Sequence, residues 1–302
     1  MSNNSNYIVN FAANYSRGTG EDNKGDRQDY KSRFTCKPNC SSTNGGPPYF
    51  SVTIFILCWV AYFTYNLGDD PNVALIKSPF IYRAKECYYF KDTWRYFTYS
   101  FLHADLAHIL SNMIIFMLVT PLLELAHDSL RPMLVYFVGV FLGAVLSGIW
   151  SPGNYLVGAS GGCYAVVLAH IANILLNCRE MDKKWLTARL VVLAPLVIMA
   201  GFDIWRAIDR YSGDFYGGGG VSYAAHVGGT ITGLLFGVVV LRNYTKENWE
   251  KYMRWVFLIL YFGFFAYAIV MTIMSWPSSE DASGDAKSLT GESSPDYGQE
   301  SD

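Results

Sequence analysis

One short stretch of this sequence has the residue pattern of a nucleophilic serine. Gly158-Ala159-Ser160-Gly161-Gly162 fits G-x-S-x-G, which presents a serine at a tight turn in many serine hydrolases. In those enzymes a strand precedes the serine and a helix follows it, whereas here a short polar loop precedes it and a long apolar run follows. The same small residues would also serve close helix packing, so the pattern alone leaves both interpretations open.

A second stretch, residues 225–233, places a histidine beside a close-packing surface. Gly229 and Gly233 form a G-x-x-x-G pair, which lets another helix backbone approach closely. His226 lies one turn before Gly229, near the same helical face. A lone histidine in a membrane helix is more often a packing residue than a catalyst, but a helix that packs on this surface would come within reach of its ring.

His103, His108 and Asn112 form a third polar group, in an otherwise apolar helix. His108 and Asn112 are four residues apart and share one face. Metal binding is the rival interpretation, but hydrogen-bond donors for the oxyanion of an acyl-transfer reaction fit these residues better. We therefore expect no metal site and no cofactor.

The elements that must hold these residues are membrane helices. Of the 302 residues, 51% are hydrophobic and only 16% are charged, whereas about 25% are charged in soluble domains. The net charge of −2 gives no indication of nucleic-acid binding. Seven apolar stretches are long enough to cross a bilayer as helices: residues 49–67, 101–125, 130–151, 158–176, 185–206, 221–241 and 253–276. We expect an all-α membrane domain at 49–276 between disordered polar tails at 1–48 and 277–302.

Lysine and arginine residues indicate how the chain crosses the membrane, because short loops rich in them face the cytoplasm. The loops after the fourth and sixth spans are rich in both residues. This places the N-terminus in the cytoplasm and the acidic C-terminus outside, so sequons at Asn3, Asn14 and Asn39 should stay unglycosylated. Residues 68–100 would be external despite their basic residues, and we interpret them as a structured segment at the membrane interface.

The predicted spans bring the serine and the histidine to a similar depth. Ser160 lies in the first turn of the fourth span and His226 about two turns into the sixth, and both spans run from outside to inside. At 1.5 Å per residue, both side chains would lie within roughly 10 Å of the outer surface. A serine and a histidine at one depth on closely packed helices would form a nucleophile and its base.

Taken together, these motifs resemble those of the rhomboid family of intramembrane serine proteases. His103-x4-His108-x3-Asn112, Gly158-Ala-Ser160-Gly and Ala225-His226-x2-Gly229-x3-Gly233 occur in this order on the second, fourth and sixth spans. Trp94-Arg95 fits the same family pattern, although alone it would mark only an interfacial tryptophan beside a snorkelling arginine. The resemblance covers the chain from about residue 50 to 275 and implies a six-helix bundle followed by a seventh transmembrane helix.

The resemblance implies a catalytic dyad of Ser160 and His226 without an aspartate, and no acidic residue accompanies His226 on its helix. Tyr164 would pack on the imidazole and orient it, as an aspartate does in a triad. His108, Asn112 and the backbone N–H of Ser160 would hold the oxyanion. Supporting roles fall to His103, Gly158, Gly229, Gly233, Trp94 and Arg95.

Two further features of the sequence each allow a functional and a purely structural interpretation. Asp203 and Arg206, near the outer end of the fifth span, resemble part of the family's lateral gate, but a plain interfacial ion pair is the simpler interpretation. Gly217 to Gly220 would form a flexible cap over the site or only a connection. His127 and His170 lie at other depths than Ser160, so we assign them to structure.

The substrates implied by the resemblance are transmembrane segments of single-pass proteins, whose ectodomains cleavage would release. Growth-factor precursors are an expectation at the level of the family. The seventh span after the core resembles rhomboids of the secretory pathway, in the Golgi, endosome or plasma membrane. A rhomboid-like protein that only binds transmembrane clients for trafficking or quality control is the alternative, but such proteins typically lack the serine or the histidine. A transporter would show an internal repeat, and we find none.

Overall fold

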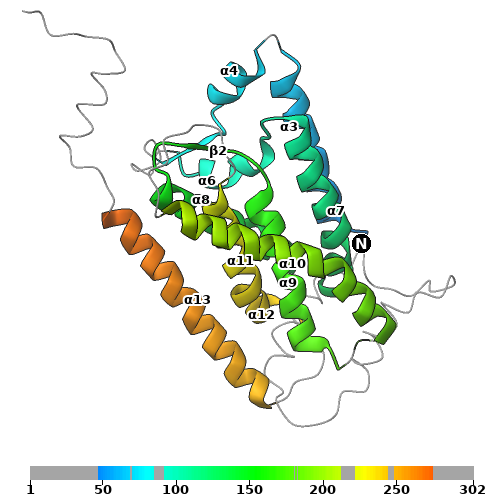
Figure 1. Ribbon diagram of the computed structural model, residues 1–302. Helices are drawn as coiled ribbons and strands as arrows, with labels where there is room; N and C mark the ends of the chain where they lie inside the picture. The colour runs from blue at the N-terminus through cyan, green and yellow to red at the C-terminus, as the bar shows by residue number, and fades with distance from the viewer. Residues whose placement is uncertain are drawn as a thin grey trace, which may run out of the picture.

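The computed structural model describes residues 47–68, 70–84, 92–179, 181, 183–211, 222–243 and 248–274. Within these residues seven helices are long and apolar enough to cross a membrane, in agreement with the seven predicted spans (Figure 1). Five of them are α3 (Tyr49–Asn66), α7 (Leu106–His127), α8 (Leu130–Trp150), α9 (Ser160–Asn177) and α10 (Lys183–Tyr211). The sixth comprises α11 (Tyr223–Ile231), the π-helical turn η2 (Thr232–Phe236) and α12 (Gly237–Val240), and the seventh is α13 (Asn248–Met274). The protein is an all-α polytopic membrane protein.

Several sequence expectations lie outside the described residues. They concern nearly all of the two polar tails, the three sequons, the Gly217 to Gly220 stretch and the side chain of Arg206.

The second span begins later than the sequence suggested. α7 starts at Leu106 because the side chain of Asp105 caps it, accepting the N–H of His108 at 2.8 Å. The residues before it form the short helix α6 (Arg95–Thr98) and the 3-10 turn η1 (Tyr99–Phe101). The expectation that His103 shares a helix with His108 and Asn112 is therefore wrong, since His103 lies in the turn before α7.

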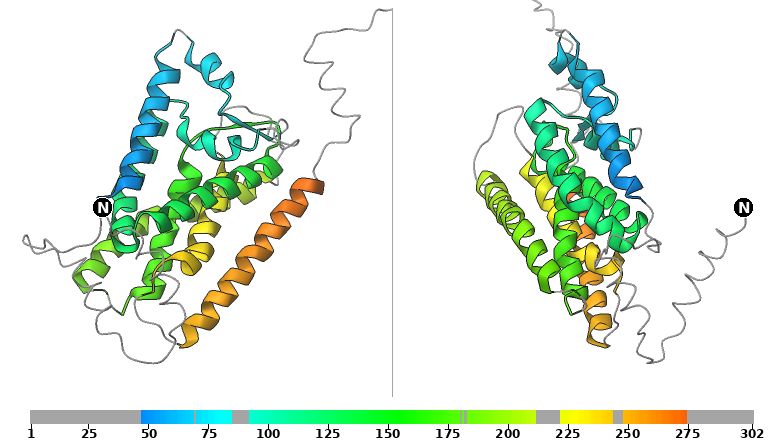
Figure 2. Two further views of the ribbon diagram at one scale, coloured as in Figure 1. Left: turned by 180° about the vertical axis from the view of Figure 1, so that it is seen from behind. Right: turned by 90° about the vertical axis from the view of Figure 1, so that its right-hand side faces the viewer.

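α9 is the helix that the others surround. In its membrane span 78% of the residues are buried, against 22% for α3 and α10 and 11% for α13. Figures 1 and 2 show α13 along one side of the bundle. The exposed apolar faces of the outer helices suit contact with lipid, whereas α9 meets mainly protein.

Glycines allow the sixth span to approach α9. A Cβ on Gly229 would overlap the carbonyl oxygen of Gly161, and a Cβ on Gly233 would overlap that of Ala165. Further along, a Cβ on Gly237 would lie 3.1 Å from the side chain of Ala172. The close helix approach expected from the G-x-x-x-G pair is confirmed.

The segment between the first two spans is structured where it is described, as expected. It contains the helix α4 (Pro71–Ile76) and the strand β1 (Tyr82–Arg83). β1 pairs antiparallel with β2 (Tyr155–Leu156), with Tyr82 opposite Leu156. Because β2 ends two residues before Gly158, this pairing connects the segment to the turn that leads to Ser160.

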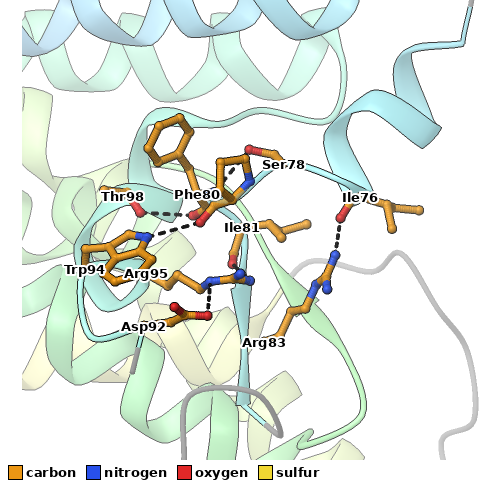
Figure 3. Close-up of polar contacts among 10 residues, drawn as sticks. Ile76, Ser78, Phe80, Ile81, Arg83, Asp92, Trp94, Arg95 and Thr98 are labelled. Carbon is orange, nitrogen blue, oxygen red and sulfur yellow. Dashed lines mark hydrogen bonds and ion pairs between the residues drawn. The ribbon is translucent and has the colours of Figure 1, made fainter. Parts of the chain in front are cut away.

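Trp94 and Arg95 hold this segment in place. The indole Nε1 of Trp94 donates to the carbonyl of Pro79 at 3.2 Å, and Nη1 of Arg95 donates to that of Ile81 at 3.2 Å (Figure 3). The Arg95 guanidinium also pairs with Asp92 at 3.1 Å. In this structure both residues brace the chain just before β1.

Candidate active site

Ser160 is the first residue of α9 and is partly exposed. The chain turns into the helix at Gly158, whose φ of +116° is a conformation that glycine adopts readily. The two-residue strand β2 precedes this turn, where the sequence suggested only a polar loop. The N–H groups of the first helical turn have no acceptor within the helix, so those of Ser160 and Gly161 can bind an anion near the serine.

His226 lies in the first turn of α11, which the Ser222 hydroxyl caps by accepting the N–H of Ala225 at 3.3 Å. Its imidazole stacks on the ring of Tyr164, with centroids 4.2 Å apart and an interplanar angle of 10°. Tyr164 follows Ser160 by four residues, so the two share one face of α9. The histidine therefore lies on the side of α9 that carries the serine.

The residues next to Ser160 and His226 also pack together, since a Cβ on Gly161 would lie 3.5 Å from the carbonyl oxygen of Ala225. Among the residues that the structure describes, no hydrogen bond joins the Ser160 hydroxyl to His226. Catalytic hydrogen bonds are often long without substrate and tighten when it binds. The structure thus brings the two residues to one site without the bond itself.

Asp203, on α10, was expected only in a lateral gate or an ion pair with Arg206, and the sequence reasoning missed its contact with His226. Its Oδ2 lies 2.7 Å from Nδ1 of His226 and also accepts a hydrogen bond from the Tyr164 hydroxyl. The expectation of a histidine without an acidic partner considered only its own helix, and the structure contradicts it. A carboxylate within a membrane span needs a partner, so the position of Asp203 in the fifth span could have indicated a polar contact with another helix.

His108 and Asn112, in the first two turns of α7, lie beside the turn that leads to Ser160. A Cβ on Gly158 would lie 2.7 Å from the His108 ring. Asn112 is buried, and its Nδ2 donates to the carbonyl of His108 at 2.9 Å. A side-chain amide has two N–H groups, so one remains available to a ligand.

His103, in the segment before α7, supports the same turn. It is fully buried, and its Nε2 accepts the backbone N–H of Ala159 at 3.4 Å. Burial, together with the nearby His108, lowers the pKa of His103 to about 3. The ring is therefore neutral near pH 7 and can accept this hydrogen bond next to Ser160.

The fold and the site define a polytopic helical membrane protein in which a serine, an imidazole and a carboxylate gather among the helices. Such a group of side chains suits acyl transfer, in which the serine attacks and the imidazole takes its proton. The Rhomboid domain family matches residues 91–243, about half of the chain. The chain belongs to the rhomboid family, and the resemblance noted in its motifs is confirmed.

Individual relatives differ in what their names say. Rhomboid-related protein 1 of Caenorhabditis elegans is 41% identical over 192 residues, which are 63% of this chain and 52% of that protein. Rhomboid-related protein 3 of Homo sapiens is 32% identical over 260 residues, 83% of this chain and 61% of that protein. The chain thus spans less than two thirds of either relative. Inactive rhomboid-related protein 2 of C. elegans is 30% identical over 252 residues, 82% of this chain and 66% of that protein.

Proposed function

We propose that this protein is an intramembrane serine endopeptidase. It would cleave transmembrane segments of single-pass proteins near the outer leaflet and release their ectodomains. The observation that carries this proposal is the stacking of Tyr164 on His226 at 4.2 Å, because it holds an imidazole on the face of α9 that carries Ser160. Family membership supports the same reaction class.

In this mechanism Ser160 is the nucleophile and His226 the general base. The Ser160 Oγ attacks the carbonyl carbon of the scissile peptide while His226 takes its proton. The imidazolium then gives that proton to the leaving amine, the C–N bond breaks, and an acyl-enzyme remains on Ser160. A water molecule that gives a proton to His226 attacks the ester, and that proton returns to Ser160 when the acid leaves.

The oxyanion formed in each half of the reaction needs donors aimed at one point. His108, the remaining N–H of Asn112 and the backbone N–H of Ser160 are the candidates, since they border the turn at Gly158. Removing one such donor typically lowers kcat by roughly 10²- to 10³-fold. Direct contact of these groups with an oxyanion is part of the proposal.

The substrate must expose its peptide carbonyl before Ser160 can attack it. A transmembrane helix hides its carbonyls in hydrogen bonds, so residues that destabilise the substrate helix near the site should favour cleavage. We propose the topology with the N-terminus cytoplasmic and the C-terminus outside, in a membrane of the secretory pathway. In that topology the site opens toward the outer face.

A second candidate function is the binding of transmembrane clients without cleavage. The chain is similar to a relative named as inactive, and this similarity supports client binding as a second candidate. Ser160 and His226 are both present here, and this favours the protease.

Cleavage of a single-pass reporter by the full chain in proteoliposomes tests the proposal. Wild type should release the ectodomain, and Ser160→Ala and His226→Ala should not. Thr64→Ala removes an exposed hydroxyl that bonds only its own helix, to the carbonyl of Val60, and should cleave like wild type. Cleavage by both site variants at the wild-type rate would exclude the mechanism. Stable capture of uncut reporters by wild type would favour client binding.

A further inference from the structure

The carboxylate of Asp203 is part of a buried three-residue cluster. Its Oδ2 lies 2.7 Å from Nδ1 of His226 and accepts the hydroxyl proton of Tyr164. Only 11% of the Asp203 side chain and 8% of the His226 side chain are exposed. An unpaired carboxylate buried among apolar helices would be strongly unfavourable, and these two contacts stabilise it there.

The contact determines which nitrogen of His226 carries a proton. A carboxylate only accepts hydrogen bonds, so Nδ1 must be the donor to Asp203. In the neutral ring Nε2 is then left without a proton and can accept one. A general base facing Ser160 needs this tautomer, because a ring protonated at Nε2 has no lone pair there.

The other described groups around the imidazole do not fix its tautomer. Tyr164 stacks on its face, and Tyr223 meets it edge-on with centroids 6.1 Å apart. His108, on α7, borders the turn at Gly158 that leads to Ser160. Stacking orients the plane of the ring but does not choose between its nitrogens, whereas a hydrogen bond to Nδ1 does.

We infer that Asp203 is a positioning residue that holds His226 in the tautomer and orientation required of a base, so that Ser160, His226 and Asp203 act as a triad. This inference rests on the proposed protease function. Asp203 belongs to α10, a peripheral helix with only 22% of its span buried. The alignment of the base therefore depends on α10 staying packed against α11.

The tautomer can be measured without any substrate. We suggest ¹⁵N solid-state NMR of the full chain, labelled at histidine and reconstituted in lipid. Five histidines are present, and the signals of His226 are those lost in His226→Ala. Wild type should show a proton on Nδ1. Asp203→Asn keeps the shape but can donate to Nδ1, so the proton should move to Nε2. The same His226 spectrum in both proteins would overturn the inference.

Kinetics test the consequence. Asp203→Asn should lower kcat for the reporter by roughly 10²- to 10⁴-fold, the range that a general base contributes, with KM unchanged. Asp70→Asn is the matched control, because Asp70 caps the distant helix α4 and asparagine caps equally well. If Asp203→Asn does not fold, Tyr164→Phe keeps the ring and removes one hydrogen bond to Asp203, which should lower kcat by roughly 2- to 10-fold.

The two proposals fail in different ways. If wild type cleaves and Asp203→Asn has the wild-type kcat, the role of Asp203 is wrong and the protease proposal stands. If wild type cleaves no reporter while the tautomer still changes in Asp203→Asn, the protease proposal fails and the positioning contact stands.

Discussion

Buried polar side chains gather at both ends of α9, and the two ends use them differently. At the Ser160 end, Asp203, Tyr164 and His226 bond or stack with one another through their side chains. They surround a serine hydroxyl that stays partly exposed. The polar side chains at this end therefore orient one another around a reactive group.

At the opposite end of α9, several polar side chains bond to backbone groups as well as to one another. Nδ1 of His127 accepts the N–H of Arg242 at 3.0 Å, and a ring nitrogen of His170 lies 2.9 Å from the carbonyl of Val119. Glu124 accepts the N–H groups of Phe50 and Ser51 at 2.8 and 3.0 Å. His127 and Glu124 accept backbone N–H groups near helix ends, and His170 contacts a carbonyl within α7, so the contacts of His127 and His170 agree with their assignment to structure.

The comparison teaches that a polar residue in a membrane span is not by itself a sign of chemistry. What separates the two ends is whether the polar side chains orient one another around a reactive hydroxyl or hold helices together. Substitutions at the Ser160 end should therefore change activity more than stability, and those at the opposite end should do the reverse.

Separating α9 from α11 should have the largest effect. A Cβ on Gly229 would overlap the carbonyl of Gly161, next to Ser160. Gly229→Ala should abolish cleavage and destabilise the fold by about 1–3 kcal/mol. A Cβ added by Gly237→Ala, at the opposite end, would lie 3.1 Å from the Cβ of Ala172, which a small shift relieves, so this variant should keep most activity. Reporter cleavage and thermal unfolding measure both effects.

Gly263→Ala provides the control, because nothing lies within 4 Å of a Cβ at that position. Equal activity of Gly229→Ala and Gly263→Ala would show that the close approach does not matter to the site.

Asn112→Ala should reduce activity with little change in stability. The Asn112 side chain bonds only the carbonyl of His108 in its own helix among the described contacts, so the fold loses little. Loss of one oxyanion donor should lower kcat by roughly 10²-fold. The checks are kcat for the reporter and the unfolding midpoint in the same preparation. A fall in activity explained wholly by unfolded protein would contradict the proposed role.

Glu124→Gln should show the opposite behaviour. The carboxylate accepts hydrogen bonds from two backbone N–H groups and from the Ser51 hydroxyl at 2.6 Å, and so ties α3 to α7. Neutralising it should destabilise the protein by about 2 kcal/mol and leave kcat of the folded enzyme unchanged. Chemical unfolding in detergent measures the first effect. A lower kcat without a loss of stability would refute the distinction between the two ends.

His103 should make a contribution to stability that depends on pH. Its pKa is lowered to about 3 by burial, so the unfolded chain binds this proton more readily than the folded one. Stability from His103 is therefore present above the ordinary histidine pKa and falls as pH drops toward 3, by about 2 kcal/mol between pH 7 and pH 5. The unfolding midpoints of wild type and His103→Gln at both pH values isolate this effect. An identical pH dependence of both proteins would contradict it.

Local patterns in the sequence predicted much of this site. The spacing of Ser160 and Tyr164, or of His226 and Gly229, acts within one helix, so one span suffices to show which side chains share a face. The partnership of Asp203 with His226 depends on how α10 rotates against α11, which no local spacing encodes. The start of α7 was misplaced because the Asp105 cap outweighs the apolar residues before it.

The most direct test of the proposed site is covalent labelling of the full chain with a fluorophosphonate, followed by mass spectrometry of the labelled peptide. An activated serine reacts with such a probe, whereas an ordinary hydroxyl does not. We predict labelling at Ser160 in wild type and its loss in His226→Ala. Labelling of Ser160 at the same rate in His226→Ala, or none in folded wild type, would contradict the claim that His226 activates Ser160.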